Sequence, residues 1–137
     1  MPWLLTLVLA FDLAAVKSEP NLERRSEKAL DYAGQAFATA RESYSSGDVK
    51  KSQDALQEVR QGVDLAYDSL SETGKDARRN PKFFKRAELK TRELLRRLDG
   101  MRQAVSIEDR ALVESVRDHV SEIHDNLLKG IMSKKKK

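Results

Sequence analysis

Apolar residues recur every three or four positions along most of the chain, from about residue 21 to residue 130. This spacing gathers them on one face of an α-helix, and no alternating stretch is long enough to predict a β-strand. Turn-forming residues interrupt the pattern in three places. The sequence therefore predicts an all-α protein, with helices at about residues 21–44, 48–73, 81–105 and 107–130.

The second predicted helix has the most regular pattern. Val49, Leu56, Val63 and Leu70 are spaced seven residues apart, which is the repeat of a coiled-coil seam that packs along its length against another helix. Four amphipathic helices of similar length, joined by short connections, are typical of an antiparallel up-down four-helix bundle. We expect that fold over residues 19–132.

Individual residues mark where the helices begin and end. Gly47 and Gly74 suit helix C-termini, and Asp48 is a good N-cap for the helix that follows it. Pro81 is favoured in a first helical turn. Residues 106–109, with the sequence SIED, resemble a capping box in which Asp replaces the usual Glu or Gln, so the fourth helix is expected to begin there.

The first predicted helix carries a stripe of small residues, namely Ala29, Ala33, Ala36 and Ala40. Small side chains allow a neighbouring helix to approach closely, because the distance between helix axes depends on the side chains at the contact. The neighbour is either another helix of the same bundle or a helix of a second protein. The sequence leaves both alternatives open.

The N-terminal segment has the features of a signal peptide. Its longest apolar run, Trp3–Phe11, is too short to span a bilayer, and small residues that suit cleavage after Ala15 or Ser18 follow it. We expect a leader over residues 1–18 and a periplasmic or secreted protein of bacterial type. No Lys or Arg precedes the apolar run, so the alternative is a buried or amphipathic first helix of a cytoplasmic protein.

The net charge of +4 is located at the C-terminus. The last four residues, Lys134–Lys137, account for all of it, because the rest of the chain has 22 basic and 22 acidic residues. A short run of like charges is usually disordered, so we expect a disordered basic tail over residues 133–137. The chain has no cysteine, which excludes disulfides, thiolate metal sites and cysteine nucleophiles.

Charge is unevenly divided among the predicted helices. Residues 74–105 contain eleven basic and four acidic residues, whereas residues 48–73 and residues 106–133 each contain three basic and six acidic residues. Opposite charges on neighbouring helices attract, although each exposed pair contributes only about 0–1 kcal/mol. We therefore expect the basic third helix to lie between the acidic second and fourth helices.

The basic third helix and the tail are the candidate anion-binding site. Cations beside Phe83 and Phe84 would suit a phosphate-binding surface with stacking aromatics. The alternative is a solvated helix face whose phenylalanines pack in the core. The candidate residues are Arg78, Arg79, Lys82, Lys85, Arg86, Lys134, Lys135, Lys136 and Lys137.

The two histidines do not form a metal or haem motif. His119 and His124 are five residues apart on one predicted helix, which separates them by about 140° around its axis. No Cys-x-x-Cys-His or Glu-x-x-His motif occurs, and we find no acid at the apolar seam positions. The sequence predicts no metal, no cofactor, no small-molecule substrate and no enzymatic activity.

The resulting hypothesis is an exported, non-enzymatic helical-bundle protein that binds another protein or associates with itself. The alternative is a binder of anionic surfaces, phospholipid or nucleic acid, through the basic third helix and the lysine tail. Nucleic acid is the less favoured of these ligands because export would separate the protein from it.

Overall fold

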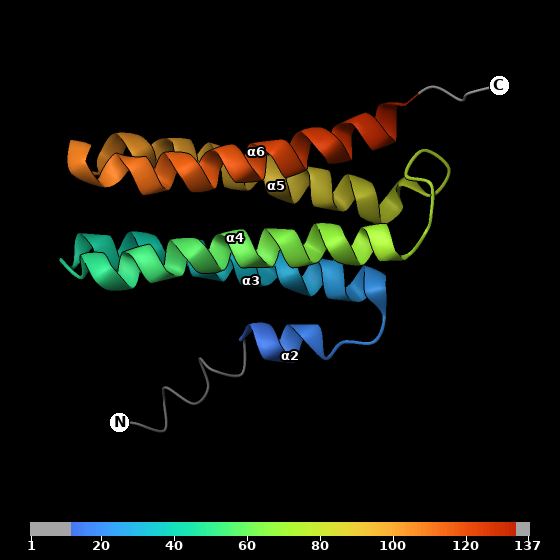
Figure 1. Ribbon diagram of the computed structural model, residues 1–137, viewed down its shortest axis with the longest axis horizontal. Helices are drawn as coiled ribbons and strands as arrows, with labels where there is room; N and C mark the ends of the chain where they lie inside the picture. Colours follow the sequence, from blue (N-terminus) through green and yellow to red (C-terminus); the bar gives the residue numbers. More distant parts are fainter. Residues whose placement is uncertain (1–11, 134–137) are drawn as a thin grey trace.

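The computed structural model describes residues 12–133, and this part of the chain contains helices and no strand. Four long helices pack together into a bundle (Figure 1). A five-residue helix, α2 (Leu13–Lys17), precedes them, and a short 3-10 turn, η1 (Ile107–Asp109), lies before the last one. The long helices are α3 (Leu22–Ser45), α4 (Val49–Glu72), α5 (Pro81–Ala104) and α6 (Arg110–Met132).

The turn residues act as the sequence predicts at four of the helix ends. Gly47 and Gly74 have φ angles of 86° and 68°, in the left-handed region that favours glycine. The side chain of Asp48 accepts a hydrogen bond of 3.1 Å from the backbone N–H of Lys51, which caps α4. Pro81 is the first residue of α5. Local chemistry therefore determines where these helices begin and end.

The start of α6 differs from the prediction. Ser106 makes no side-chain capping bond to the helix, residues 107–109 form the 3-10 turn, and α6 begins at Arg110. The reason is a competing partner, because the Ser106 hydroxyl donates to the Asp109 carboxylate and the Ser106 N–H donates to the hydroxyl of Tyr44 on α3. The expected capping box is replaced by a contact between two distant parts of the chain.

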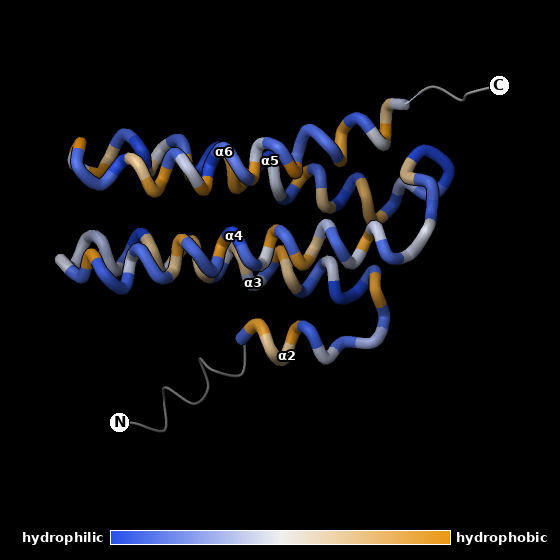
Figure 2. Tube along the Cα trace, in the orientation of Figure 1, coloured by the Kyte–Doolittle hydropathy of each residue, from blue (hydrophilic) through white to orange (hydrophobic). Residues whose placement is uncertain are grey.

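The core lies where the apolar stripes of the four long helices meet. In Figure 2 the hydrophobic positions lie along the sides of these helices that face one another. Val63 and Leu70 of α4, Leu98 of α5, and Val116 and Val120 of α6 are all fully buried. No helix between residues 12 and 133 is both long enough and apolar enough to cross a bilayer.

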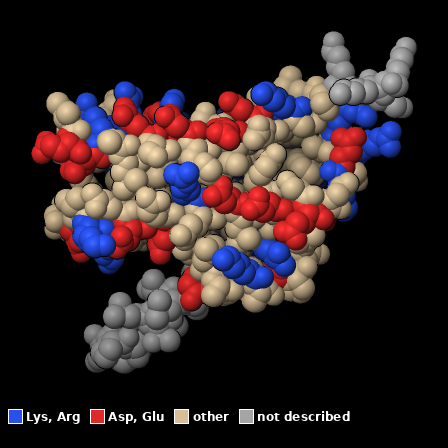
Figure 3. Space-filling model, in the orientation of Figure 1, with Lys and Arg blue, Asp and Glu red and all other residues tan. Residues whose placement is uncertain are grey.

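The basic helix α5 has one of the two neighbours that its charge predicts, α6, but α3 takes the place expected for α4. It packs mainly against α6 and then against α3, and its contact with α4 is slight. Helix α3 supplies acids of its own that pair with α5: Arg86 lies 2.7 Å from Glu27, and Lys90 lies 2.5 Å from Asp31. The acidic helices α4 and α6 instead lie side by side, and acidic side chains mark both of them in Figure 3.

The end of the predicted leader forms part of the folded structure. Asp12 caps α2 by accepting a 2.9 Å hydrogen bond from the N–H of Ala15, and Val16 is buried where α2 packs against α3. The apolar run Trp3–Phe11 and the tail Lys134–Lys137 lie outside the described residues. The positions where we expect cleavage, Ala15 and Ser18, fall within α2 and at its end.

Candidate functional site

The two histidines connect α6 to two different helices. The Nε2 atom of His119 lies 2.5 Å from the Asp64 carboxylate of α4, and that of His124 lies 2.6 Å from the Glu88 carboxylate of α5. Each imidazole is therefore held at the edge of the core by a carboxylate from another helix. Their five-residue spacing places the two side chains on different sides of α6, so they meet different partners.

Glu88 is a buried acid that the sequence analysis missed. Its side chain is only 7% exposed, and Arg92 binds both of its oxygens, at 2.9 and 2.8 Å. Burial on its own would raise the pKa of Glu88, but the hydrogen bonds from His124 and Arg92 outweigh it and hold the pKa below its usual value. Glu88 is therefore an ionised partner in a structural cluster. The sequence feature that could have identified Glu88 is its spacing of four residues from Arg92, which favours an ion pair on a helix.

These acid–histidine pairs do not assemble into a metal site. Between residues 12 and 133, no group of three or more His, Asp or Glu side chains is close enough to hold a metal ion. A protein metal site needs more ligands than a single acid–histidine pair supplies. The pairs hold helices together.

Three of the five candidate anion-binding side chains that the structure describes are engaged with acids. Arg86 pairs with Glu27, while Arg78 and Arg79 share the carboxylate of Asp76 at 3.7 and 4.0 Å. Over the described part of the chain, Lys82 and Lys85 form no ion pair, and both are exposed.

The two phenylalanines are not available for base stacking. Phe84 is buried in the core, as the alternative interpretation of the basic helix expected. Phe83 is partly buried, and its ring is covered by Lys82 and Arg86, whose cationic groups lie 5.3 and 5.4 Å from the ring centroid. These cation–π contacts occupy the aromatic face that a nucleobase would need.

The alanine stripe of α3 packs inside the bundle, against α4. Ala29, Ala33, Ala36 and Ala40 are all buried. A Cβ atom added to Gly62 of α4 would lie 2.9 Å from the carbonyl oxygen of Ala29, so the two backbones nearly touch there. The alternative in which this stripe meets a second protein is therefore wrong, because α4 already covers it.

A different face of α3 is open. A groove of about 570 Å³ runs between α3 and α5, with the small residues Gly34 and Ala38 on its α3 side. Apart from the adjoining residues and the backbone of α3 itself, no atom lies within 4 Å of a Cβ built on Gly34. The groove is the best candidate for a binding site between residues 12 and 133. Its remaining lining residues are Leu30, Asp31, Gln35, Lys90, Glu93, Leu94 and Arg97.

The sequence analysis did not single out this groove. The available signal was a glycine four residues before an alanine, Gly34 and Ala38, in the middle of a predicted helix. A mid-helix glycine is unfavourable for helix stability, so it invites a packing or functional explanation. Whether Gly34 serves packing or leaves a groove depends on the helix that faces it, and the sequence does not specify that helix.

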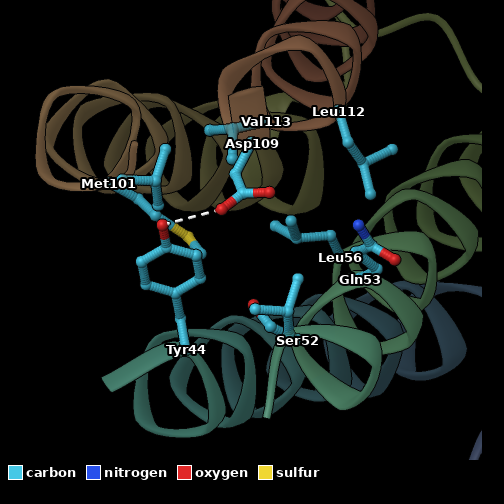
Figure 4. A pocket seen from close by; sticks show the side chains of 10 residues that line it. Tyr44, Ser52, Gln53, Leu56, Met101, Asp109, Leu112 and Val113 are labelled. Carbon is cyan, nitrogen blue, oxygen red and sulfur yellow. Dashed lines mark hydrogen bonds between the residues drawn. The ribbon is translucent and has the colours of Figure 1, made fainter. Parts of the chain in front are cut away.

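A second hollow, at the end of the bundle near η1, is structural. Tyr44 donates a 2.8 Å hydrogen bond to Asp109 (Figure 4). It also accepts one of 2.9 Å from the N–H of Ser106. The enclosed space beside them is only about 10 Å³, roughly the room for one water. This network connects the end of α3 to the start of α6 and leaves no room for a ligand.

Comparisons with known proteins add no candidate residue. Neither family models, nor curated proteins, nor solved structures match this chain.

Proposed function

We propose that this chain is an exported, non-enzymatic helical-bundle protein that binds another protein in the groove between α3 and α5. The observation that supports this proposal is the groove itself, about 570 Å³ in volume, at a place where α3 presents glycine and alanine. A groove between two helices suits an amphipathic helix, whose apolar side chains enter while its polar face remains in water.

The lining of the groove suits such a partner. Leu30 and Leu94 form the floor of the groove and are themselves buried in the bundle, and Gly34 leaves space for an incoming side chain. Charges of both signs surround it: Asp31 and Glu93 are acidic, and Lys90 and Arg97 are basic. A partner helix with both acidic and basic residues would be oriented by these charges, which contribute more to specificity than to affinity.

Photo-crosslinking tests this proposal directly. A photoreactive amino acid at Gln35, in the groove, is expected to give one discrete adduct in the native host, and Gly34→Leu is expected to abolish it by filling the groove. The same amino acid at Gln57, exposed on α4, is the matched control. Adducts at neither position, or equally at both, would contradict the proposal. An adduct of twice the chain mass would identify the partner as a second copy.

The order of the helices and the removal of the leader are part of this proposal. We propose an antiparallel up-down order of the four long helices, in a bacterial protein whose first 15 or 18 residues are removed during export. Tight turns after α3 and after α5, and a loop after α4, support the helix order. Small residues around Ala15 and Ser18 support the cleavage.

The intact mass of the protein from fractions of the native host tests export. A mass that lacks residues 1–15 or 1–18, in the periplasm or the medium, is the expected result. Cleavage after Ser18 would remove all of α2, and cleavage after Ala15 would leave Val16 at the new N-terminus. A full-length chain confined to the cytoplasm would contradict export. It would not affect the proposal that a partner binds in the groove, which the crosslinking experiment tests separately.

A further inference from the structure

The loop between α4 and α5 lies against the last turns of α6. Ala77 of the loop is buried. A Cβ atom added to Gly130 of α6 would lie 3.4 Å from the Cβ of Ala77. The loop and the end of α6 therefore lie together at one end of the bundle (Figure 1). The lysine tail follows Ser133 directly in sequence, so the chain enters the tail from this same end.

This end of the bundle carries more cations than its acids neutralise. Arg78 and Arg79 share the single carboxylate of Asp76 through long contacts of 3.7 and 4.0 Å. Three exposed lysines nearby, Lys82, Lys85 and Lys129, form no ion pair within the described residues. Figure 3 shows Lys and Arg side chains gathered around this end.

One large apolar side chain, Met132, is exposed near these cations. Met132 is 70% exposed, although large apolar side chains are usually buried. It lines a shallow hollow of about 240 Å³ with Leu128, Lys129 and Asp125. Exposed apolar residues beside lysines are typical of segments that lie in the interface of a bilayer, where the apolar groups enter the headgroup region and the cations meet anionic headgroups.

We propose that this end of the bundle is a contact surface for a bilayer that contains anionic phospholipid. The surface consists of the residues Arg78, Arg79, Lys82, Lys85, Leu128, Lys129 and Met132. This inference goes beyond the proposed function, because it concerns a different surface and a different kind of partner. The protein would hold its α3–α5 groove, which lies along the side of the bundle, exposed to solution while the basic end rests on the lipid.

A bilayer explains these residues better than a nucleic acid does. Cations alone would suit either polyanion, but Phe83 and Phe84 are occupied and cannot stack on bases. Met132 and Leu128 would gain nothing from a phosphate backbone, whereas they would gain from entering the boundary between headgroups and acyl chains. The apolar residues therefore decide between the two ligands.

The test is sedimentation of the full chain with vesicles of phosphatidylcholine alone and of phosphatidylcholine with phosphatidylglycerol. Because the run Trp3–Phe11 can bind neutral lipid as well, the quantity compared is the ratio of binding to anionic and to neutral vesicles. We expect this ratio to exceed about tenfold at low salt and to fall steeply between about 50 and 200 mM salt, as for attraction by several charges. A ratio near one at low salt would overturn the proposal.

Two variants and one control locate the surface. Lys82→Glu with Lys85→Glu is expected to lower the ratio about tenfold, and Met132→Ser is expected to lower binding to anionic vesicles without changing the salt dependence. Lys50→Glu with Lys51→Glu makes the same charge change on α4 near the opposite end, and is expected to leave the ratio within about twofold.

Three outcomes would contradict this surface. Equal losses in the control and in the Lys82/Lys85 variant would indicate attraction by net charge alone. Loss of binding after truncation at Ser133, with no effect of Lys82→Glu and Lys85→Glu, would assign the contact to the tail alone. Equal salt-dependent binding to DNA, together with no effect of Met132→Ser, would favour nucleic acid. Circular dichroism of each variant confirms that it is folded.

Discussion

Helix α3 presents small residues on two of its faces, and the bundle uses these faces in opposite ways. On one face, Ala29 and Ala33 are fully buried against Gly62 of α4, and the two helices nearly touch. On the other, Gly34 and Ala38 lie beside α5, and a groove of about 570 Å³ remains open. Residues of similar size thus produce a filled contact on one side and a hollow on the other.

The difference lies in the facing helix. Helix α4 presents a glycine to the alanine stripe, so the backbones approach until almost no space remains. Helix α5 presents Lys90, Glu93 and Arg97, which are long and charged. Lys90 pairs with Asp31 of α3, and Glu93 pairs with Arg97, so none of these side chains fills the space beside Gly34. Small residues therefore bring helices together only where the opposing residues are also small. Where the opposing residues are long and charged, the same small residues leave room for another molecule.

The largest expected effect comes from filling the closed side of α3. Gly62→Val should lower the free energy of unfolding by about 3 kcal/mol, because its side chain would meet the backbone oxygen of Ala29, which cannot move without shifting α3. Urea unfolding followed by circular dichroism measures the change. Wild-type stability in this variant would show that α3 and α4 are not in close contact.

Tyr32 reports on the same closed side through its ionisation. Burial first, and the nearby Glu58 carboxylate second, raise the pKa of Tyr32 to about 12. The folded state therefore holds this proton more tightly than the unfolded state, whose tyrosine pKa is near 10. The resulting stability is fully present below pH 10 and is lost as the pH rises towards 12, by up to about 1.4 kcal/mol per pH unit.

Tyr32→Phe is expected to remove this part of the alkaline dependence. The measurement is urea unfolding of the wild type and the variant at several pH values between 8 and 11.5. Tyr67→Phe, which changes a partly buried tyrosine of α4, is the matched control. If the free energies of unfolding of the wild type and of Tyr32→Phe changed with pH in parallel, Tyr32 would be solvated. The side of α3 that faces α2 and α4 would then not be tightly packed.

The smallest effect is expected from the ion pairs on the open side. Replacing Glu27 by Gln and Asp31 by Asn removes the contacts to Arg86 and Lys90. Because these side chains are largely exposed, the loss should stay below about 1 kcal/mol and should vanish in 1 M salt. A loss above about 2 kcal/mol would mean that charge, and not the buried leucines, holds α3 against α5.

Much of the helical architecture was predictable because it depends on local signals. The three-to-four spacing of apolar residues identifies helices, and residues such as Gly47, Asp48 and Pro81 mark their ends. The choice of neighbours was not predictable in the same way. Every long helix has an apolar stripe that can pack against any other. The charges of the helices predicted that α5 would lie beside α4, but Glu27 and Asp31 of α3 offer its cations partners as well.

For the candidate sites too, local features were predictable from the sequence and contacts between helices were not. The spacing of His119 and His124 indicated that they would not share a ligand, and the structure directs them to different helices. Glu88 was missed because a search of apolar seam positions does not consider an acid that Arg92 and His124 neutralise. The groove beside Gly34 depends on which side chains α5 presents, and this information is not local to α3. The anion-binding residues remain a prediction.

One face of α3 is open beside Gly34, and the stability of Gly34→Leu is the sharpest measure of that space. If the space beside Gly34 is empty, leucine should be accepted there and should raise the free energy of unfolding by about 0.5–1 kcal/mol, through its better helix propensity. Gly100→Leu, at an exposed and unobstructed position of α5, should show a similar gain. A loss of about 1–3 kcal/mol at Gly34 alone would show that this face is packed like the other, and would contradict the account.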